Sequence, residues 1–169
     1  EEEKEKFLKE ISRKSVKSIL FSGEGEPLLY KGLPQIVSFA KKSGLDVALT
    51  SNATLLSKDI SRQIIPHLTW LRVSLNAGSA KTYSFIHRTD PKDFRKVINN
   101  LGDAVKIKKQ NKYNCTIGAQ LLLLNENYKE IDKLAIILKE IGVDYLIIKP
   151  YSQHPLSINR LKPGLDYRK

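Results

Sequence analysis

The sequence has one cysteine, no methionine and no long hydrophobic run. The single cysteine, Cys115, excludes an intramolecular disulfide and fits a reducing compartment, so we expect a cytoplasmic protein. No apolar run approaches the ~20 residues that a bilayer-spanning helix needs, and no signal peptide opens the chain, so we expect no membrane partner. The lack of methionine fits the scarcity of thermolabile residues in thermophilic proteins. Because the chain starts at Glu1 without an initiator methionine, we interpret it as a fragment or the ordered part of a longer protein.

Charged residues are abundant, and the positive ones are in excess. The 169 residues include 29 Lys and Arg against 18 Asp and Glu, which gives a net charge of +11. The basic residues are spread along the chain, and their densest group is Lys106, Lys108, Lys109 and Lys112. Aromatic residues are not interleaved with them, as they are in platforms for single-stranded nucleic acid. We interpret this pattern as a solvated surface, with an RNA or another acidic partner as the alternative.

Short apolar segments alternate with amphipathic ones along the whole chain. Strands are predicted at residues 16–21, 46–50, 70–76, 115–124 and 145–150. Helices are predicted at residues 34–44, 57–66, 90–105 and 131–142, and residues 1–11 form the end of an earlier helix. Short strands separated by helices pair in parallel through right-handed crossovers. The alternation therefore predicts an α/β domain with a parallel sheet in chain order, helices on its outer face and an open edge.

Three side chains have specific predicted places in this domain. Asp90 is predicted to cap the third of these helices, with Pro91 in its first turn. Cys115 is predicted to be a small core residue of the fourth strand. Trp70 begins the third strand and is predicted to pack against a crossover helix.

Polar residues follow each predicted strand. They are the segment 23–27, Thr50, Ser51, Asn52, Arg72, Ser74, Asn76, Gln120, Asn125, Lys149, Tyr151, Gln153 and His154. A flat doubly wound sheet and a barrel both fit the alternation, and in both folds ligands bind beyond the carboxyl ends of the strands. The five tips therefore predict one polar pocket in either fold.

The first tip, Gly23-Glu24-Gly25-Glu26-Pro27, has the most distinctive chemistry. Glycine permits left-handed or strained backbone angles and lets a ligand approach closely, and proline fixes the exit of the loop. Two carboxylates in such a loop make an anionic cup that suits an ammonium or sulfonium group. The alternative reading is an ordinary Gly-Pro turn that carries solvated acids.

Three of the tips resemble successive signatures of the radical S-adenosylmethionine (SAM) superfamily. These are SGEGEP at residues 22–27, LTSNA at 49–53 and RVSLNA at 72–77, and IKPY at 148–151 fits the region of the family's sixth strand. The resemblance implies an α/β fold of the partial (β/α)6, TIM-like barrel type, with about five of its βα strands present in residues 1–150. Residues 151–169 would then form a C-terminal tail that leads toward an absent segment.

The resemblance also implies a SAM site built from the strand tips. The methionyl ammonium would lie against residues 23–27, where Glu26 supplies the charge. The other implied contacts are a pocket wall from Thr50, Ser51 and Asn52, ribose or carboxylate contacts from Ser74 and Asn76, a ribose contact from Gln120, and a carboxylate contact from Arg88 or Lys149.

One departure from the family pattern concerns the iron–sulfur cluster. The family binds a [4Fe–4S] cluster through the motif Cys-x-x-x-Cys-x-x-Cys, whereas this chain has only Cys115, and one thiolate cannot hold such a cluster. The resemblance places the motif upstream of Glu1. We therefore expect the chain to begin after the motif and to be inactive by itself.

The function implied for the full-length protein is reductive cleavage of SAM by the [4Fe–4S] cluster. The resulting 5′-deoxyadenosyl radical would abstract hydrogen from a peptide, nucleotide, RNA or small metabolite, with an electron donor as a further partner. Alternatives from other classes are a non-catalytic βα-barrel module for a nucleotide or phosphate and a basic RNA-interaction domain. The carboxylates of the first tip argue against phosphate, because a phosphate loop needs bare amides and a cation.

Overall fold

The computed structural model describes residues 2–23 and 25–151, and its five parallel strands form one sheet in chain order. The strands are β1 (Ser18–Phe21), β2 (Asp46–Ser51), β3 (Trp70–Ser74), β4 (Thr116–Leu123) and β5 (Tyr145–Pro150). The helices are α1 (Glu2–Arg13), α2 (Leu33–Lys42), α3 (Lys58–Ile64), α4 (Ala80–His87), α5 (Lys92–Asn111) and α6 (Ile131–Ile141), with 3₁₀ turns η1 (Pro27–Leu29), η2 (Ile65–His67) and η3 (Tyr128–Glu130). The predicted parallel sheet in sequence order is confirmed.

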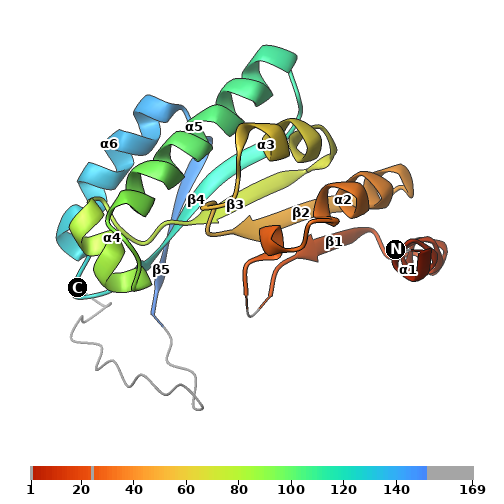
Figure 1. Ribbon diagram of the computed structural model, residues 1–169, viewed down its shortest axis with the longest axis horizontal. Helices are drawn as coiled ribbons and strands as arrows, with labels where there is room; N and C mark the ends of the chain where they lie inside the picture. Colours follow the sequence, from red (N-terminus) through yellow and green to blue (C-terminus); the bar gives the residue numbers. More distant parts are fainter. Residues whose placement is uncertain (1, 24, 152–169) are drawn as a thin grey trace.

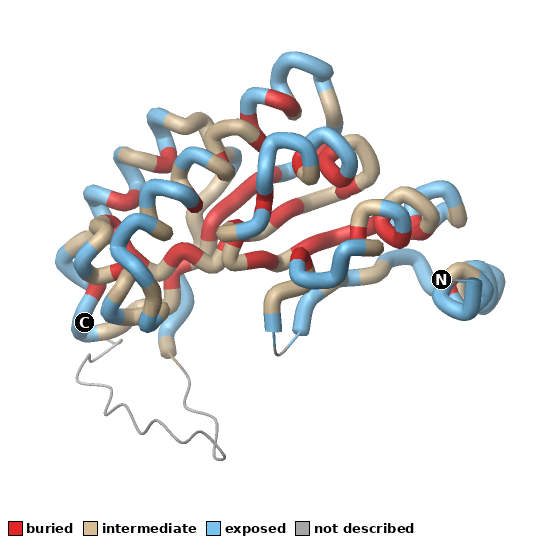
Figure 2. The backbone as a smooth tube through the Cα atoms, in the orientation of Figure 1, coloured by how far each residue is buried: buried red, intermediate tan, exposed pale blue. Residues whose placement is uncertain are grey.

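The two faces of the sheet have different surroundings. Crossovers of one hand between neighbouring strands place their helices on one side, and α2, α3, α5 and α6 lie together on that side in Figure 1. The strand residues that point toward these helices are completely buried; examples are Leu49, Leu71, Val73, Ile117 and Leu121. Figure 2 shows the buried stretches running through the middle strands and the inner sides of the helices. The hydrophobic core therefore lies between the sheet and its helical layer.

The opposite side of the sheet, which we call the open face, carries polar and aromatic side chains. Because side chains alternate along a strand, the residues between the core positions lie on this face. We define the open face by Thr50, Trp70, Arg72, Ser74, Gln120 and Tyr145, all of which are only partly buried. The side chains of the open face therefore lie outside the hydrophobic core.

The prediction that Trp70 packs against a crossover helix is wrong. Leu71 and Val73 take the helix-facing positions of β3, so Trp70 lies on the open face. There the guanidinium carbon of Arg72 is 4.9 Å from the centroid of its indole ring. Cys115, in contrast, is buried in the core as predicted, although it lies just before β4 and not within it.

Two helix starts differ from the predictions. The predicted cap at Asp90 is wrong by one residue, because α5 begins at Lys92 with Pro91 as the flanking residue, although an Asp90 oxygen accepts from the Lys92 amide at 2.8 Å. Helix α4 was not predicted, since only Tyr83 among its residues is buried and its apolar pattern is short. Residues 152–169, with the predicted contacts Gln153 and His154, lie outside the described residues.

Candidate functional site

Glu26 joins the tips of the first two strands. One of its carboxylate oxygens accepts hydrogen bonds from the Leu28 amide at 3.0 Å and from the Ser51 hydroxyl at 2.7 Å, and the other accepts from the Asn52 amide at 2.7 Å. An ionised carboxylate offers about four acceptor positions, so acceptor capacity is left for one further donor. The predicted charge at the first tip is therefore held in a fixed place by the chain itself.

The glycines of the first tip keep the space beside Glu26 free of side chains. A Cβ added at Gly25 would meet no atom within 4 Å, and one added at Gly23 would meet only the Gly25 amide at 3.9 Å. Gly23 is not among the glycines with a positive φ, so left-handed geometry is not the reason for glycine at that position. Pro27 starts the turn η1, and Glu24 lies outside the described residues. Close approach by a ligand is the property that this loop retains.

The second tip is divided between the two faces of the sheet. Ser51 is almost fully buried, and its hydroxyl also accepts from the Ala53 amide at 2.8 Å. The Asn52 side-chain oxygen accepts from the amide and the hydroxyl of Thr54, at 2.9 Å and 2.7 Å. The hydroxyl of Thr50 is buried on the open face and has no hydrogen-bond partner among the described residues. Thr50 therefore differs from its two neighbours in having an unused polar group.

Ser74 and Gln120 lie opposite each other on the open face, because their Cα atoms are register partners in β3 and β4. Both are partly buried, and no hydrogen bond joins either side chain to another described residue. They are at the same end of the sheet as Glu26. Of the predicted contacts, these two are the pair that the structure brings together with polar groups available.

Asn76, Arg88 and Lys149 have other surroundings. Asn76 has a φ of 54°, and its side-chain oxygen accepts from the Leu122 amide at 2.8 Å, so that oxygen is used within the fold. Arg88 is the exposed, left-handed residue that ends α4. Lys149 is exposed on β5 opposite Leu122.

The loop after β3 is held by two side chains that the sequence reasoning did not single out. Asn127 is fully buried, and its amide nitrogen donates to the carbonyl oxygens of Asn76 and Leu122, both at 2.8 Å. Glu130 accepts from the Gly78 amide at 2.9 Å and from the hydroxyls of Ser79 and Thr82 at 2.7 Å and 2.8 Å. The change from four leucines at residues 121–124 to the polar run at 125–127 was the available signal for Asn127.

Helix α4 contributes a buried phenol close to this region. Burial raises the pKa of Tyr83 to about 12, and the carboxylates of Asp93 and Glu26 act in the same direction. Tyr83 therefore stays neutral near Glu26 at physiological pH. Its ring stacks on His87 with the ring centroids 4.3 Å apart.

The residues present do not fit an iron–sulfur cluster. Cys115 lies at the amino end of β4, opposite to the strand tips, and burial raises the pKa of its thiol to about 12. Within residues 2–23 and 25–151, no group of three or more His, Cys, Asp or Glu side chains is placed to hold a metal ion. A buried, protonated thiol is a core residue, so Cys115 is not a ligand for a cluster.

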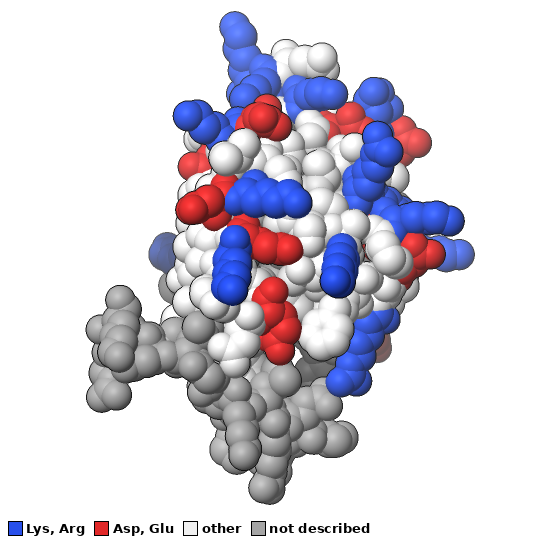
Figure 3. Space-filling model, turned by 90° about the vertical axis from the view of Figure 1, so that its left-hand side faces the viewer, with Lys and Arg blue, Asp and Glu red and all other residues white. Residues whose placement is uncertain are grey.

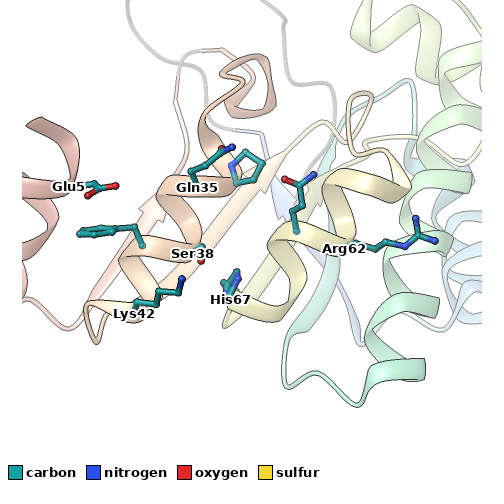
Figure 4. Close-up of a pocket in the computed structure, with 9 residues that line it drawn as sticks. Glu5, Gln35, Ser38, Lys42, Arg62 and His67 are labelled. Carbon is teal, nitrogen blue, oxygen red and sulfur yellow. The ribbon is translucent and has the colours of Figure 1, made fainter. Parts of the chain in front are cut away.

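Two hollows in the surface have different relations to the strand tips. One lies at the first tip and is lined by Gly23, Gly25 and Glu26 together with apolar side chains such as Leu29. The other lies on the outer helical surface, where residues of α1, α2, α3 and η2 meet (Figure 4). Its Lys42 and His67 precede β2 and β3, so part of its lining lies at the amino ends of the strands. The first hollow is therefore the one that belongs to the candidate site.

The surface charges do not form a field of one sign on the face that can be seen in Figure 3. Acidic side chains lie among the Lys and Arg side chains there, near the end of the molecule formed by α4 and α6. This mixture is the pattern expected for a solvated surface. No helix within the described residues is long and apolar enough to cross a membrane.

The sequence has relatives among known proteins. It is 31% identical over 154 residues to an uncharacterized protein of Methanocaldococcus jannaschii. This match covers 88% of this chain and 50% of the relative. It is 26% identical over 159 residues to the GTP 3',8-cyclase of Chlorobaculum tepidum. This match covers 91% of this chain and 46% of that protein. The chain thus spans about half the length of these two curated relatives.

Solved structures show the same fold. TYW1 with a lysine-pyruvate adduct bound matches with a TM-score of 0.69 and 24% identity, over 87% of this chain and 44% of that one. The enzyme anSMEcpe with bound AdoMet matches with a TM-score of 0.65 and 17% identity, over 95% of this chain and 46% of that one. The five parallel strands and their helices match these partial barrels, which confirms the predicted fold class.

The sequence profile of the Radical SAM superfamily matches residues 1–138. The chain belongs to the radical SAM superfamily.

Proposed function

We propose that this chain is the SAM-binding part of a radical SAM enzyme. The observation that carries the proposal is the carboxylate of Glu26, fixed between the tips of β1 and β2 with acceptor capacity left. A SAM ammonium donates charge-assisted hydrogen bonds of the kind that this oxygen accepts. Gly23 and Gly25 leave room for the methionyl group beside it.

Residues of β3, β4 and the loop after β3 complete the proposed SAM site around Glu26. Ser74 and Gln120 present a hydroxyl and an amide to the ribose or carboxylate of SAM. Asn76 acts through its backbone position, because its side-chain oxygen is bonded to Leu122. When bound, SAM supplies the adenosyl group on which the chemistry of the family depends. The residues of this chain bind that group, orient it and limit its exposure to water.

Membership of the superfamily does not determine the substrate of the full-length protein, so the substrate is proposed separately. The superfamily member SuiB has been solved bound to S-adenosylmethionine and bound to the precursor peptide SuiA. Other matching proteins are GTP 3',8-cyclases. We propose that the partners are SAM, an electron donor and a substrate that is a peptide, a nucleotide, an RNA or a small metabolite.

The proposal predicts that Glu26→Gln weakens SAM binding by charge. Loss of a charge-assisted contact costs about 1.5–3 kcal/mol, which corresponds to a roughly tenfold or larger rise in Kd. Gln also places an NH₂ group where the Asn52 amide or the Ser51 hydroxyl now donates, so the loop geometry changes as well. The measurement is calorimetry with SAM on the cluster-loaded enzyme.

Two further variants separate charge from geometry. Ser51→Ala removes one donor to Glu26 but keeps the carboxylate, so it should weaken SAM binding less than Glu26→Gln. Asp59→Asn removes an exposed carboxylate that pairs with Arg62 on the same helix, and it should leave the Kd unchanged. Unchanged SAM binding in Glu26→Gln would place the site elsewhere, and an equal loss in Ser51→Ala would show that loop geometry is the cause.

A further inference from the structure

One row of residues crosses the open face directly beside the Ser74–Gln120 pair. The register joins Thr50 to Arg72, Arg72 to Gly118 and Gly118 to Tyr145, so these four residues lie side by side on four adjacent strands. Arg72 precedes Ser74 by two residues, which places it ~6.5 Å deeper along the same strand. The row therefore lies on the same face as the proposed SAM contacts, one layer further in.

Arg72 is a cation without an anion in this row. Its Nε atom is buried and has no hydrogen-bond partner, and no carboxylate forms an ion pair with it within the part of the chain that the structure describes. The neighbouring Thr50 hydroxyl is likewise buried, with no hydrogen-bond partner in residues 2–23 and 25–151. Buried polar groups in proteins are almost always hydrogen-bonded, because leaving them unpaired is costly. Two such groups at register-paired positions indicate that something outside the described residues satisfies both.

Two aromatic side chains, Trp70 on the same strand and Tyr145 of the row, interact with the guanidinium. The Trp70 ring stacks on Arg72 at 4.9 Å from centroid to guanidinium carbon. On the other side, the Tyr145 ring lies over Gly118, where an added Cβ would be only 2.3 Å from a ring carbon. Burial raises the pKa of Tyr145, and the charge of Arg72 opposes that rise, which is consistent with a phenol close to the guanidinium. A planar guanidinium stacked on an aromatic ring presents its donor edge to a planar or tetrahedral oxyanion.

We propose that Arg72, flanked by Trp70 and Tyr145 and assisted by the Thr50 hydroxyl, binds an oxyanion, a carboxylate or phosphate group, carried by the substrate. The identification of this oxyanion as part of the substrate rests on the proposed function, because SAM would occupy the outer layer at Ser74 and Gln120. The binding of an oxyanion by Arg72 rests on the geometry alone. Glycine at position 118 is required in this arrangement, since any side chain there displaces Tyr145.

Trp70 is the single tryptophan of the chain, so its fluorescence reports on Arg72 directly. The experiment titrates the 169-residue chain with inorganic phosphate and, separately, with acetate, at constant ionic strength kept with chloride. We expect a saturable change in Trp70 emission with at least one of the two anions, and the anion that binds more tightly identifies phosphate or carboxylate as the group. Chloride at equal ionic strength should give no saturable change.

Matched variants test whether Arg72 is the binding group. Arg72→Gln should raise the Kd at least tenfold, and Thr50→Val should raise it by a smaller factor. Arg95→Gln removes one positive charge from an exposed position of α5 and should keep the wild-type Kd, which controls for the net charge of the chain. Arg72→Lys keeps the charge without the planar fork, so we expect its Kd between those of the wild type and Arg72→Gln.

The outcomes separate this proposal from the proposed function. No saturable change with either anion, or equal affinity in Arg72→Gln and the wild type, would overturn the oxyanion site. Arg72→Gln should leave the SAM affinity of the cluster-loaded enzyme unchanged, because the proposed SAM contacts lie in the outer layer. Saturable anion binding through Arg72 together with a failure of Glu26→Gln to affect SAM would contradict the SAM proposal and keep the oxyanion site.

Discussion

The carboxylate of Glu26 shows what a single residue does at this site before any ligand binds. Its oxygens receive donors from Leu28, Ser51 and Asn52, so the same charge that suits an ammonium also connects two strand tips. The sequence pattern predicted the charge, because two acids in a Gly-Pro loop are visible as letters. The cross-connection was not predictable, because it depends on the Ser51 side chain turning from the helix side toward a different loop.

At the same scale, His87 is predicted to make stability depend on pH. Burial lowers the pKa of His87 below its ordinary value of 6.5, and the hydrogen bond from Nε2 to the Leu75 carbonyl at 3.2 Å opposes this only in part. A folded-state pKa below the unfolded one means that the unfolded state takes up the proton first as the pH falls. The stabilisation is therefore complete above about pH 6.5 and decreases as the pH falls through that value.

The measurement is urea unfolding at about pH 7.5 and about pH 5.5, a window in which carboxylates of lowered pKa stay ionised. The free energy of unfolding should be smaller at the lower pH. In His87→Gln the difference between the two pH values should shrink, and the remainder should come from His67, whose pKa is also lowered by burial. An unchanged pH difference in His87→Gln would contradict the assignment.

Among elements, the loop between β3 and α4 is the one most closely tied to a distant segment. Asn127 bonds to Asn76 and Leu122, and Glu130 accepts from Gly78, from the α4 N-cap Ser79 and from Thr82 in α4. Although burial acts to raise it, the hydrogen bonds from Ser79, Thr82 and Gly78 lower the pKa of Glu130 below its ordinary value. The segment after β4 thus fixes the position at which β3 ends, next to Ser74.

Asn127→Ala is predicted to destabilise the protein by about 2–4 kcal/mol, because it removes the buried hydrogen bonds and leaves their backbone partners unpaired. Urea unfolding at neutral pH measures the loss. Asp132→Asn is the matched control, since Asp132 is exposed on the adjacent α6, and it should change stability by less than about 0.5 kcal/mol. A loss in Asn127→Ala no larger than in the control would show that the loop does not depend on Asn127.

The same loop shows where sequence reasoning about elements ends. The third strand was predicted to continue to Asn76, but it ends at Ser74. The Leu75 amide still donates to the Gln120 carbonyl oxygen, whereas Asn76 takes a positive φ and bonds to Leu122 through its side chain. Helix α4 has a readable cap at Ser79, yet its burial rests mainly on Tyr83, so it lacks the periodic apolar stripe that made α5 and α6 predictable. Both errors occur where tertiary hydrogen bonds, and not local pattern, determine the chain path.

For the whole molecule, the parallel order of five strands followed from the alternation of short strands and helices, because such strands can pair only through crossovers. The gathering of polar tips at one edge followed from the same topology. The topology did not predict which strand tips keep polar groups without a hydrogen-bond partner. Thr50 and Ser51, for example, are neighbours in sequence but have opposite surroundings. That difference arises from the alternation of β2 relative to the helical layer, which is set by how the whole sheet packs.

The order of the strands has a consequence for how the native protein opens. Each strand pairs only with its neighbours in sequence, so the sheet has the connectivity of a linear array. Among the described strands, β1 and β5 have one partner each, whereas β3 is bordered on both sides. Local opening from either end breaks one ladder, but exposure of β3 requires the loss of two.

Native-state hydrogen exchange should therefore be graded across the sheet. Amides of Leu71 and Val73 in β3 should exchange slowest, at rates close to those of global unfolding, and those of the four-residue β1 should exchange fastest among the strands. Mass spectrometry of peptides that cover each strand measures the order, and equal protection of β1 and β3 would contradict it. If protection from exchange declines outward from β3, the Glu26 loop, which follows β1, samples open states far more often than β3, the strand that carries Arg72.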